Sequence, residues 1–338
     1  MDLNAVWFLL IAVLLAGYAA LDGFDLGAGM LHLFARTEEE RRVNLNAIGP
    51  VWDGNEVWLL TGGGALFAAF PPVYAYVFSS FYLALMLLLV ALIFRAVSFE
   101  FRKQVDSPAW RKLWDGAFGL GSFLAALLVG IAFGNILHGV PLTADGRFDG
   151  NFFTLLHPYA ILVGLVGLAA FLQHGAIFVA LKSQGALQAR MAKVAPAAWM
   201  ALVLLVMAVL SVTFFSAKFL YEGILKKPFF WITFIGFWVS ILGVPLAVKV
   251  GKFGRAWTAS FASIVCLMGL GFTALFPRLV PSSLDLAHSL TAYNAASTPK
   301  TLLVMFSIAA VGVPIVIGYT IFAYRVFRGK VSLDNESY

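Results

Sequence analysis

Residues 17–31 read GYAALDGFDLGAGML, an apolar run that carries two aspartates, Asp22 and Asp25. An ionised carboxylate at the centre of a bilayer costs about 2.5–3.5 kcal/mol on insertion scales. Because the two aspartates are three residues apart, they lie near one face of a helix. A membrane segment with two such groups needs a neighbouring charge, a water-filled cavity or a bound proton to hold them.

The composition around this stretch indicates a helical protein that crosses a membrane many times. Of the 338 residues, 61% are hydrophobic and only 12% are charged, whereas soluble domains have about 25% charged residues. The net charge of +6 is attributed to cytoplasmic loops rather than to nucleic-acid binding, so no nucleic-acid partner is expected. A single cysteine, Cys266, excludes a disulfide framework. The first segment lacks the features of a cleaved signal peptide, so a retained helix is expected.

Nine apolar segments are long enough to span a membrane, which takes about 20 residues. They cover residues 6–34, 50–70, 73–101, 114–137, 155–181, 196–217, 228–248, 257–277 and 301–325. The charged run from Arg36 to Arg42 is expected to be a solvated loop, and residues 145–150 a turn. The sequence therefore predicts one all-α membrane domain over residues 1–338, with two four-helix halves, 1–137 and 155–277, and a peripheral helix, 301–325.

The distribution of basic residues predicts the orientation of these nine segments. With nine spans, 17 of the 23 Lys and Arg residues fall on the side that holds the C-terminus. Basic residues concentrate in cytoplasmic loops. The N-terminus is therefore expected outside and the C-terminus in the cytoplasm.

Several charged residues fall inside the segments, near their cytoplasmic ends. Asp53 and Glu56 open the second segment, Arg95 lies near the end of the third, and Asp115 begins the fourth. Together with Asp22 and Asp25 they predict a polar cluster in the inner half of the membrane, which either transfers protons or holds a cation. Structural roles are the alternatives to this functional cluster. The buried acids would then only pack against neighbouring helices, Asp53 would interact with the positive end of a helix dipole, and Arg95 would extend to the membrane interface.

The histidines carry less information than the acids. Only His174 lies deep within an apolar segment, whereas bis-histidine haem ligation needs two facing histidines in the membrane. No motif for covalent haem attachment, zinc hydrolysis or nucleotide phosphates is found in the sequence. We therefore expect no haem ligands on this chain and leave any metal undefined.

Two motifs resemble one known family specifically, and the resemblance extends over nearly the whole chain. The family is subunit II of the cytochrome bd quinol oxidases. The first motif is GYAALDGFDLG, residues 17–27, and the second is GPVWDGNEVW, residues 49–58. Further matches are residues 63–71, 94–95, 114–115, 134–135, 139–141, 150–153, 276–277 and 281–283.

The resemblance implies a heterodimer with a haem-bearing subunit I in a prokaryotic cytoplasmic membrane. That partner would hold a low-spin haem b, a high-spin haem b and haem d, oxidise quinol and reduce dioxygen to water. This chain would be its haem-free partner of similar fold, and small single-helix accessory subunits and a structural quinone in this chain are also compatible with the family.

The resemblance further implies a cytoplasmic proton path along Asp22, Asp25, Asp53 and Glu56, with a cation or ion-pair cluster of Asp25, Arg95 and Asp115. Some members carry glutamine at the position of Glu56, so the resemblance supports Asp53 more strongly. Burial would tune such carboxyl groups for proton exchange near neutral pH.

Two other functions are compatible with intramembrane acids. A stand-alone proton-coupled secondary transporter would use them for transport, and transporters often place broken helices at matching positions of two halves. Here the acids gather in the first four segments, which favours the oxidase subunit. In a purely structural scaffold, replacing Asp25 and Asp53 by asparagine would leave turnover unchanged.

Overall fold

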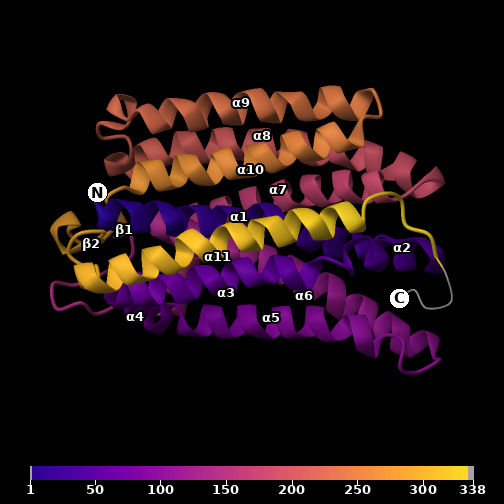
Figure 1. The fold of residues 1–338 in the computed structure, drawn as a ribbon, viewed down its shortest axis with the longest axis horizontal. Helices are drawn as coiled ribbons and strands as arrows, with labels where there is room; N and C mark the ends of the chain where they lie inside the picture. Colours follow the sequence, from indigo (N-terminus) through magenta and orange to yellow (C-terminus); the bar gives the residue numbers. More distant parts are fainter. Residues whose placement is uncertain (1, 334–338) are drawn as a thin grey trace.

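The structure, a computed structural model, describes residues 2–333 and consists mainly of long helices that run side by side (Figure 1). The α helices are α1 Leu3–His32, α2 Glu38–Ile48, α3 Trp52–Ala69, α4 Pro71–Ser80, α5 Tyr82–Phe101, α6 Pro108–His138, α7 Pro158–Lys182, α8 Gly185–Ser216, α9 Pro228–Lys249, α10 Phe253–Leu275 and α11 Pro299–Val326. Two short antiparallel strands, β1 Arg278–Val280 and β2 Leu290–Thr291, lie at one end of the molecule.

Eight of these helices are long and apolar enough to cross a membrane: α1, α5, α6, α7, α8, α9, α10 and α11. This confirms the polytopic helical class. The predicted segment 50–70 corresponds to α3, which is not among the eight within residues 2–333, because Asp53, Asn55 and Glu56 occupy its first turns. The predicted segment 73–101 is divided at Phe81 into α4 and α5. The count of nine spans and their orientation stay predictions.

The charged run from Arg36 to Arg42 is not a loop, so that prediction is wrong. Residues Glu38–Ile48 form α2. The side chain of Thr37 accepts a hydrogen bond from the backbone N–H of Glu40 and caps the helix. Three glutamates then occupy the first turn, where carboxylates interact favourably with the positive end of the helix dipole. The cap and the helix dipole thus stabilise a helix in a stretch whose low hydropathy predicts only that it is exposed to solvent.

Helix α1 forms the centre of the molecule and packs against α3, α6, α7 and α10. Its glycines allow close approach of neighbouring backbones. A Cβ at Gly27 would lie 1.9 Å from the carbonyl oxygen of Phe171 and 2.9 Å from the Cα of Gly175. Since α1 packs on helices of both predicted halves, 1–137 and 155–277, a division into two units stays a prediction.

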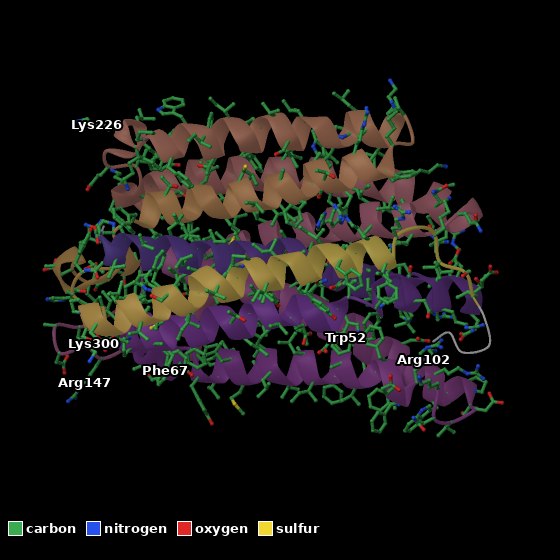
Figure 2. All side chains as sticks on the ribbon, viewed as in Figure 1. Trp52, Phe67, Arg102, Arg147, Lys226 and Lys300 are labelled. Atoms are coloured by element: carbon green, nitrogen blue, oxygen red, sulfur yellow. The ribbon has the colours of Figure 1, made fainter. Side chains whose placement is uncertain are left out.

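The two ends of the bundle differ in their elements. Figure 1 shows the strands and the N-terminus at one end and α2 at the other, with α11 crossing obliquely over the bundle. Figure 2 shows Arg102 at the end where α2 lies and Arg147 and Lys300 at the opposite end. By the predicted orientation, α2 and Arg102 face the cytoplasm.

Candidate functional site

A buried arginine joins two helices that carry acids. Arg95 of α5 is fully buried, and its Nη2 donates to Oδ1 of Asp22 in α1 at 2.9 Å. Its Nη1 donates to Oε1 of Glu56 in α3. The guanidinium also lies 5.8 Å from the ring centre of Trp52, a distance at which cation–π attraction acts. Arg95 therefore links α1 and α3 through charge-assisted hydrogen bonds.

The second aspartate of α1 has an amide partner instead of a charged one. Asn55 of α3 donates from Nδ2 to Oδ2 of Asp25 at 2.7 Å and to the carbonyl of Leu21 at 3.2 Å. The hydroxyl of Tyr324, near the end of α11, donates to Oδ1 of Asn55 at 3.0 Å. Asp25 is thus oriented by a hydrogen-bond chain that begins on the last helix.

We call Asp22, Asp25, Asn55, Glu56 and Arg95 the acid cluster. It sets three carboxyl groups against one guanidinium group, so full ionisation would leave two uncompensated negative charges in a largely buried site. Such charges cost several kcal/mol, and a proton bound among the carboxyl groups relieves that cost. Within the described residues, Oδ2 of Asp22 and Oδ1 of Asp25 have no hydrogen-bond partner. The arrangement is therefore suited to binding and releasing protons.

Asp115 does not join the acid cluster. Its Oδ1 lies 2.6 Å from Nε2 of His32 and accepts a hydrogen bond of 2.6 Å from Nε of Arg102. Arg41 approaches its Oδ2 at 3.4 Å, and Arg102 also donates to Glu38 at 2.8 Å. We call His32, Glu38, Arg41, Arg102 and Asp115 the surface ion cluster. The structure does not support the expected grouping of Asp115 with Arg95 and Asp25, because Arg102, one residue beyond α5, is the arginine that reaches α6.

The surface ion cluster keeps the guanidinium group of Arg102 positively charged. Partial burial opposes the charge of the Arg102 guanidinium, but the hydrogen bonds and charges of Asp115 and Glu38 outweigh that effect and raise the pKa of Arg102. A positively charged guanidinium therefore anchors this cluster.

Asp53 lies apart from the other predicted site residues. It is exposed on α3, two residues before the buried Asn55 and therefore on the opposite side of the helix. Glu56 is partly buried, with 23% of its side chain exposed, and connects this exposed face of α3 to Arg95. Of the predicted proton path, Asp22, Asp25 and Glu56 gather around Arg95, and Asp53 faces outward.

Several residues of the two clusters were not predicted as site residues from the sequence. Asn55 stands between the predicted Asp53 and Glu56, and its polarity within an apolar helix was a usable signal. Tyr324, which donates a hydrogen bond to Asn55 of the acid cluster, had no such signal, because nothing near it in the sequence shows that α11 crosses α3. His32 follows Asp25 by seven residues on α1, and no role was predicted for it from the sequence.

His174 is the one histidine that the sequence places deep in the membrane, and its surroundings do not fit a haem ligand. Nε2 lies 3.1 Å from the carbonyl oxygen of Ala20. The fully buried ring stacks on Trp257 and meets Phe24 and Phe261. A haem iron at Nε2 would displace that hydrogen bond, and one at either nitrogen would open this aromatic packing. The surroundings of His174 therefore fit a packed, hydrogen-bonded imidazole and not an axial haem ligand.

Comparison with known proteins identifies the family of the chain. The sequence profile of cytochrome bd terminal oxidase subunit II matches residues 3–327. The chain is 37% identical to cytochrome bd-I ubiquinol oxidase subunit 2 of Escherichia coli (strain K12), over 98% of this chain and 96% of that protein. It is 38% identical to cytochrome bd ubiquinol oxidase subunit 2 of Bacillus subtilis (strain 168), over 98% and 97%.

The fold is also similar to a solved structure, described as the structure of bd oxidase from Geobacillus thermodenitrificans. The TM-score is 0.81 at 16% identity, over 97% of this chain and 99% of that chain. At this identity the match concerns the fold alone. The family profile and the near-full-length relatives show that the chain belongs to the family of cytochrome bd terminal oxidase subunit II.

Proposed function

We propose that this chain is subunit II of a quinol-oxidising, dioxygen-reducing terminal oxidase and that its acid cluster takes up protons from the cytoplasm. The relatives are named ubiquinol oxidase subunits, which implies a partner subunit I, haem cofactors and a quinol substrate. The observation that carries the proton role is the group of three carboxyl groups of the acid cluster, two of which accept hydrogen bonds from the fully buried Arg95 while the third accepts one from Asn55.

In this proposal the chemistry is divided between two chains. The haems of the partner subunit, two of type b and one of type d, would carry electrons from quinol to dioxygen. This chain's residues would supply protons: Asp25, oriented by Asn55, exchanges them, and Arg95 holds Asp22 and Glu56 in place. Reducing one dioxygen to water consumes four protons, and taking them from the cytoplasm separates charge across a prokaryotic cytoplasmic membrane.

A stripe along α3 is the surface that we assign to the partner subunit. It consists of Asp53, Val57, Leu60, Gly64 and Phe67, spaced four, three, four and three residues apart, so they share one face. Leu60 is 73% exposed and Phe67 59%, and a Cβ at Gly64 would meet no atom of the described chain within 4 Å. An aspartate facing lipid is costly, whereas a haem-bearing helical partner would cover Asp53 and pack on the small and apolar residues.

The transporter alternative is not favoured by the family membership. Accessory single-helix subunits, a structural quinone in this chain and a bound cation stay predictions. None of them is needed for the proton role of the acid cluster.

The assembly part of the proposal is tested by visible spectroscopy of the chain purified alone and with its partner from the native membrane. We expect no haem bands from the chain alone, and b and d bands with quinol oxidase activity from the complex. Introducing tryptophan at Gly64 should prevent co-purification of the haem protein, whereas the same change at Gly312 of α11 should not. A chain that is active and monodisperse without a partner would contradict the proposal.

A further inference from the structure

The surface ion cluster and the acid cluster lie about two helical turns apart along the two helices that they share, α1 and α5. His32 follows Asp25 by seven residues on α1, and Arg102 follows Arg95 by seven residues at the end of α5. Seven residues correspond to about 10 Å along a helix and return to nearly the same face. The two clusters therefore lie on nearly the same sides of α1 and α5, one nearer the end of the bundle and one deeper inside it.

Two buried hydroxyl groups, those of Ser122 and Ser98, lie at helical levels between the two clusters. Ser122 is fully buried on α6, seven residues after Asp115. A Cβ added at Gly29 of α1 would lie only 2.0 Å from the Oγ of Ser122, so this hydroxyl packs directly against α1. Gly29 itself lies between Asp25 and His32. Ser98 is buried on α5 between Arg95 and Arg102.

Gly121, the residue before Ser122 on α6, packs against α5. A Cβ at Gly121 would lie 3.2 Å from the backbone nitrogen of Arg95. Ser122 is therefore level with the acid cluster on one side and with Gly29 on the other. Its hydroxyl, like that of Ser98, can both donate and accept a hydrogen bond.

The two ring nitrogens of His32 have different surroundings, as a group that relays protons requires. Its side chain is fully buried, and Nε2 lies 2.6 Å from Oδ1 of Asp115. Within the described residues, Nδ1 is buried without a hydrogen-bond partner. Phe118 packs edge-on against the ring at 5.2 Å, and Phe118 also contacts Phe99, so aromatic side chains pack beside the imidazole. One nitrogen thus faces the charged surface and the other faces the interior.

We propose that protons pass from the carboxyl groups of the surface ion cluster to the acid cluster through the imidazole of His32, which belongs to the first cluster, and the hydroxyls of Ser122 and Ser98. Nε2 first gains a proton from the Asp115 side, which makes the ring positively charged, and Nδ1 then loses its proton toward Ser122 and Asp25, which makes the ring neutral again. The ring then returns to its first tautomer. The charged groups around it are Asp115 of α6, Glu38 and Arg41 of α2, and Arg102 beyond α5. This inference rests on the proposed proton uptake by the acid cluster.

The test uses the assembled oxidase complex in liposomes and compares His32→Gln, Asp25→Asn and His288→Gln. Glutamine at position 32 retains an N–H for Asp115 but cannot relay a proton, and His288 lies in a short 3₁₀ helix at the opposite end. Proton uptake during a single turnover is followed together with haem content. We expect His32→Gln to slow proton uptake roughly ten- to hundredfold at unchanged haem content, less than the full effect of a positioned proton-transfer group because water substitutes in part.

A solvent isotope effect separates proton relay from structural support. If His32 relays protons, uptake limits turnover in His32→Gln and the isotope effect on turnover rises. If His32→Gln behaves like His288→Gln while Asp25→Asn is slow, the relay is wrong and the proposed function stands. If Asp25→Asn is also unaffected, the proposed function fails as well.

A second variant covers the case in which His32→Gln does not assemble. Ser122→Ala removes only a hydroxyl that bonds to Phe118 O within its own helix. Ser263→Ala of α10 is the matched control, because Ser263 is also buried and bonds within its helix, to Ser260 O. Slower proton uptake in Ser122→Ala alone supports the relay, and equal rates in both variants overturn it.

Discussion

Tyr324 and Asn55 are 269 residues apart in the sequence, yet the hydroxyl of Tyr324 donates a hydrogen bond of 3.0 Å to Oδ1 of Asn55. Asn55 in turn donates to Asp25 at 2.7 Å. The peripheral helix α11, which is otherwise mostly exposed, therefore fixes the orientation of an acid at the centre of the bundle.

Tyr324→Phe should loosen this chain of hydrogen bonds without breaking the packing of the ring. Loss of one hydrogen bond costs about 1 kcal/mol, so assembly should persist. Turnover should fall a few-fold because Asn55 no longer holds Asp25 in one orientation. Quinol oxidase assays of the complex measure this, with Tyr319→Phe, which changes an exposed residue of the same helix, as the control. Equal activity of the two variants would show that α11 does not position the acid.

Arg95→Gln should destabilise the protein strongly. Removing one partner of a buried ion pair costs about 3–5 kcal/mol, because Asp22 and Glu56 are left without their counter-charge. Thermal unfolding in detergent should show a much lower midpoint for Arg95→Gln than for Arg147→Gln, which alters an exposed pair with Asp145. Adding Asp22→Asn to Arg95→Gln should recover part of the loss. A midpoint unchanged from that of the unsubstituted chain would mean that the charges of the acid cluster are not buried.

Gly27→Ala should force α1 and α7 apart, because a Cβ there would lie 1.9 Å from Phe171 O. Overpacking of this kind costs about 1–3 kcal/mol. Gly312→Ala of α11 has open space around it and should be neutral or slightly stabilising, as expected for alanine in a helix. Thermal unfolding of both variants measures the difference, and similar midpoints would contradict the close approach of α1 and α7.

His157 should make stability depend on pH. Burial and the nearby His138 lower the pKa of His157 to about 4, from an ordinary value of 6.5. The unfolded chain then binds more protons than the folded one between these values, so stability is full above about pH 6.5 and falls as the pH drops toward 4.

The matched variant is His157→Asn, which retains a side-chain acceptor for the backbone N–H of Ala160 at the start of α7. Thermal unfolding at pH 7.5 and pH 5 should show a smaller loss of stability in His157→Asn than in the unsubstituted chain. The same loss in both would assign the pH dependence to other groups.

The sequence predicted those parts of the fold and site that depend on local composition. Asp22, Asp25 and Arg95 stand out because charges are rare in apolar segments, and the structure brings Asp22 and Arg95 into direct contact. The partner of Asp115 was not predicted, because Arg95 and Arg102 lie two turns apart on the same side of α5 and only the packing of α6 decides which one it meets. The contact of Tyr324 depends on the path of α11, which no local pattern encodes.

Whether the acid cluster supplies protons for dioxygen reduction can be measured as proton uptake in an Asp25→Asn complex during a single turnover. Asparagine preserves the size of the side chain and its hydrogen-bond geometry but cannot bind a proton. Asp145→Asn, in an exposed turn at the opposite end, is the control. We expect normal haem content in both variants and strongly slowed proton uptake in Asp25→Asn alone. Proton uptake at the unsubstituted rate in a fully assembled Asp25→Asn complex would contradict it.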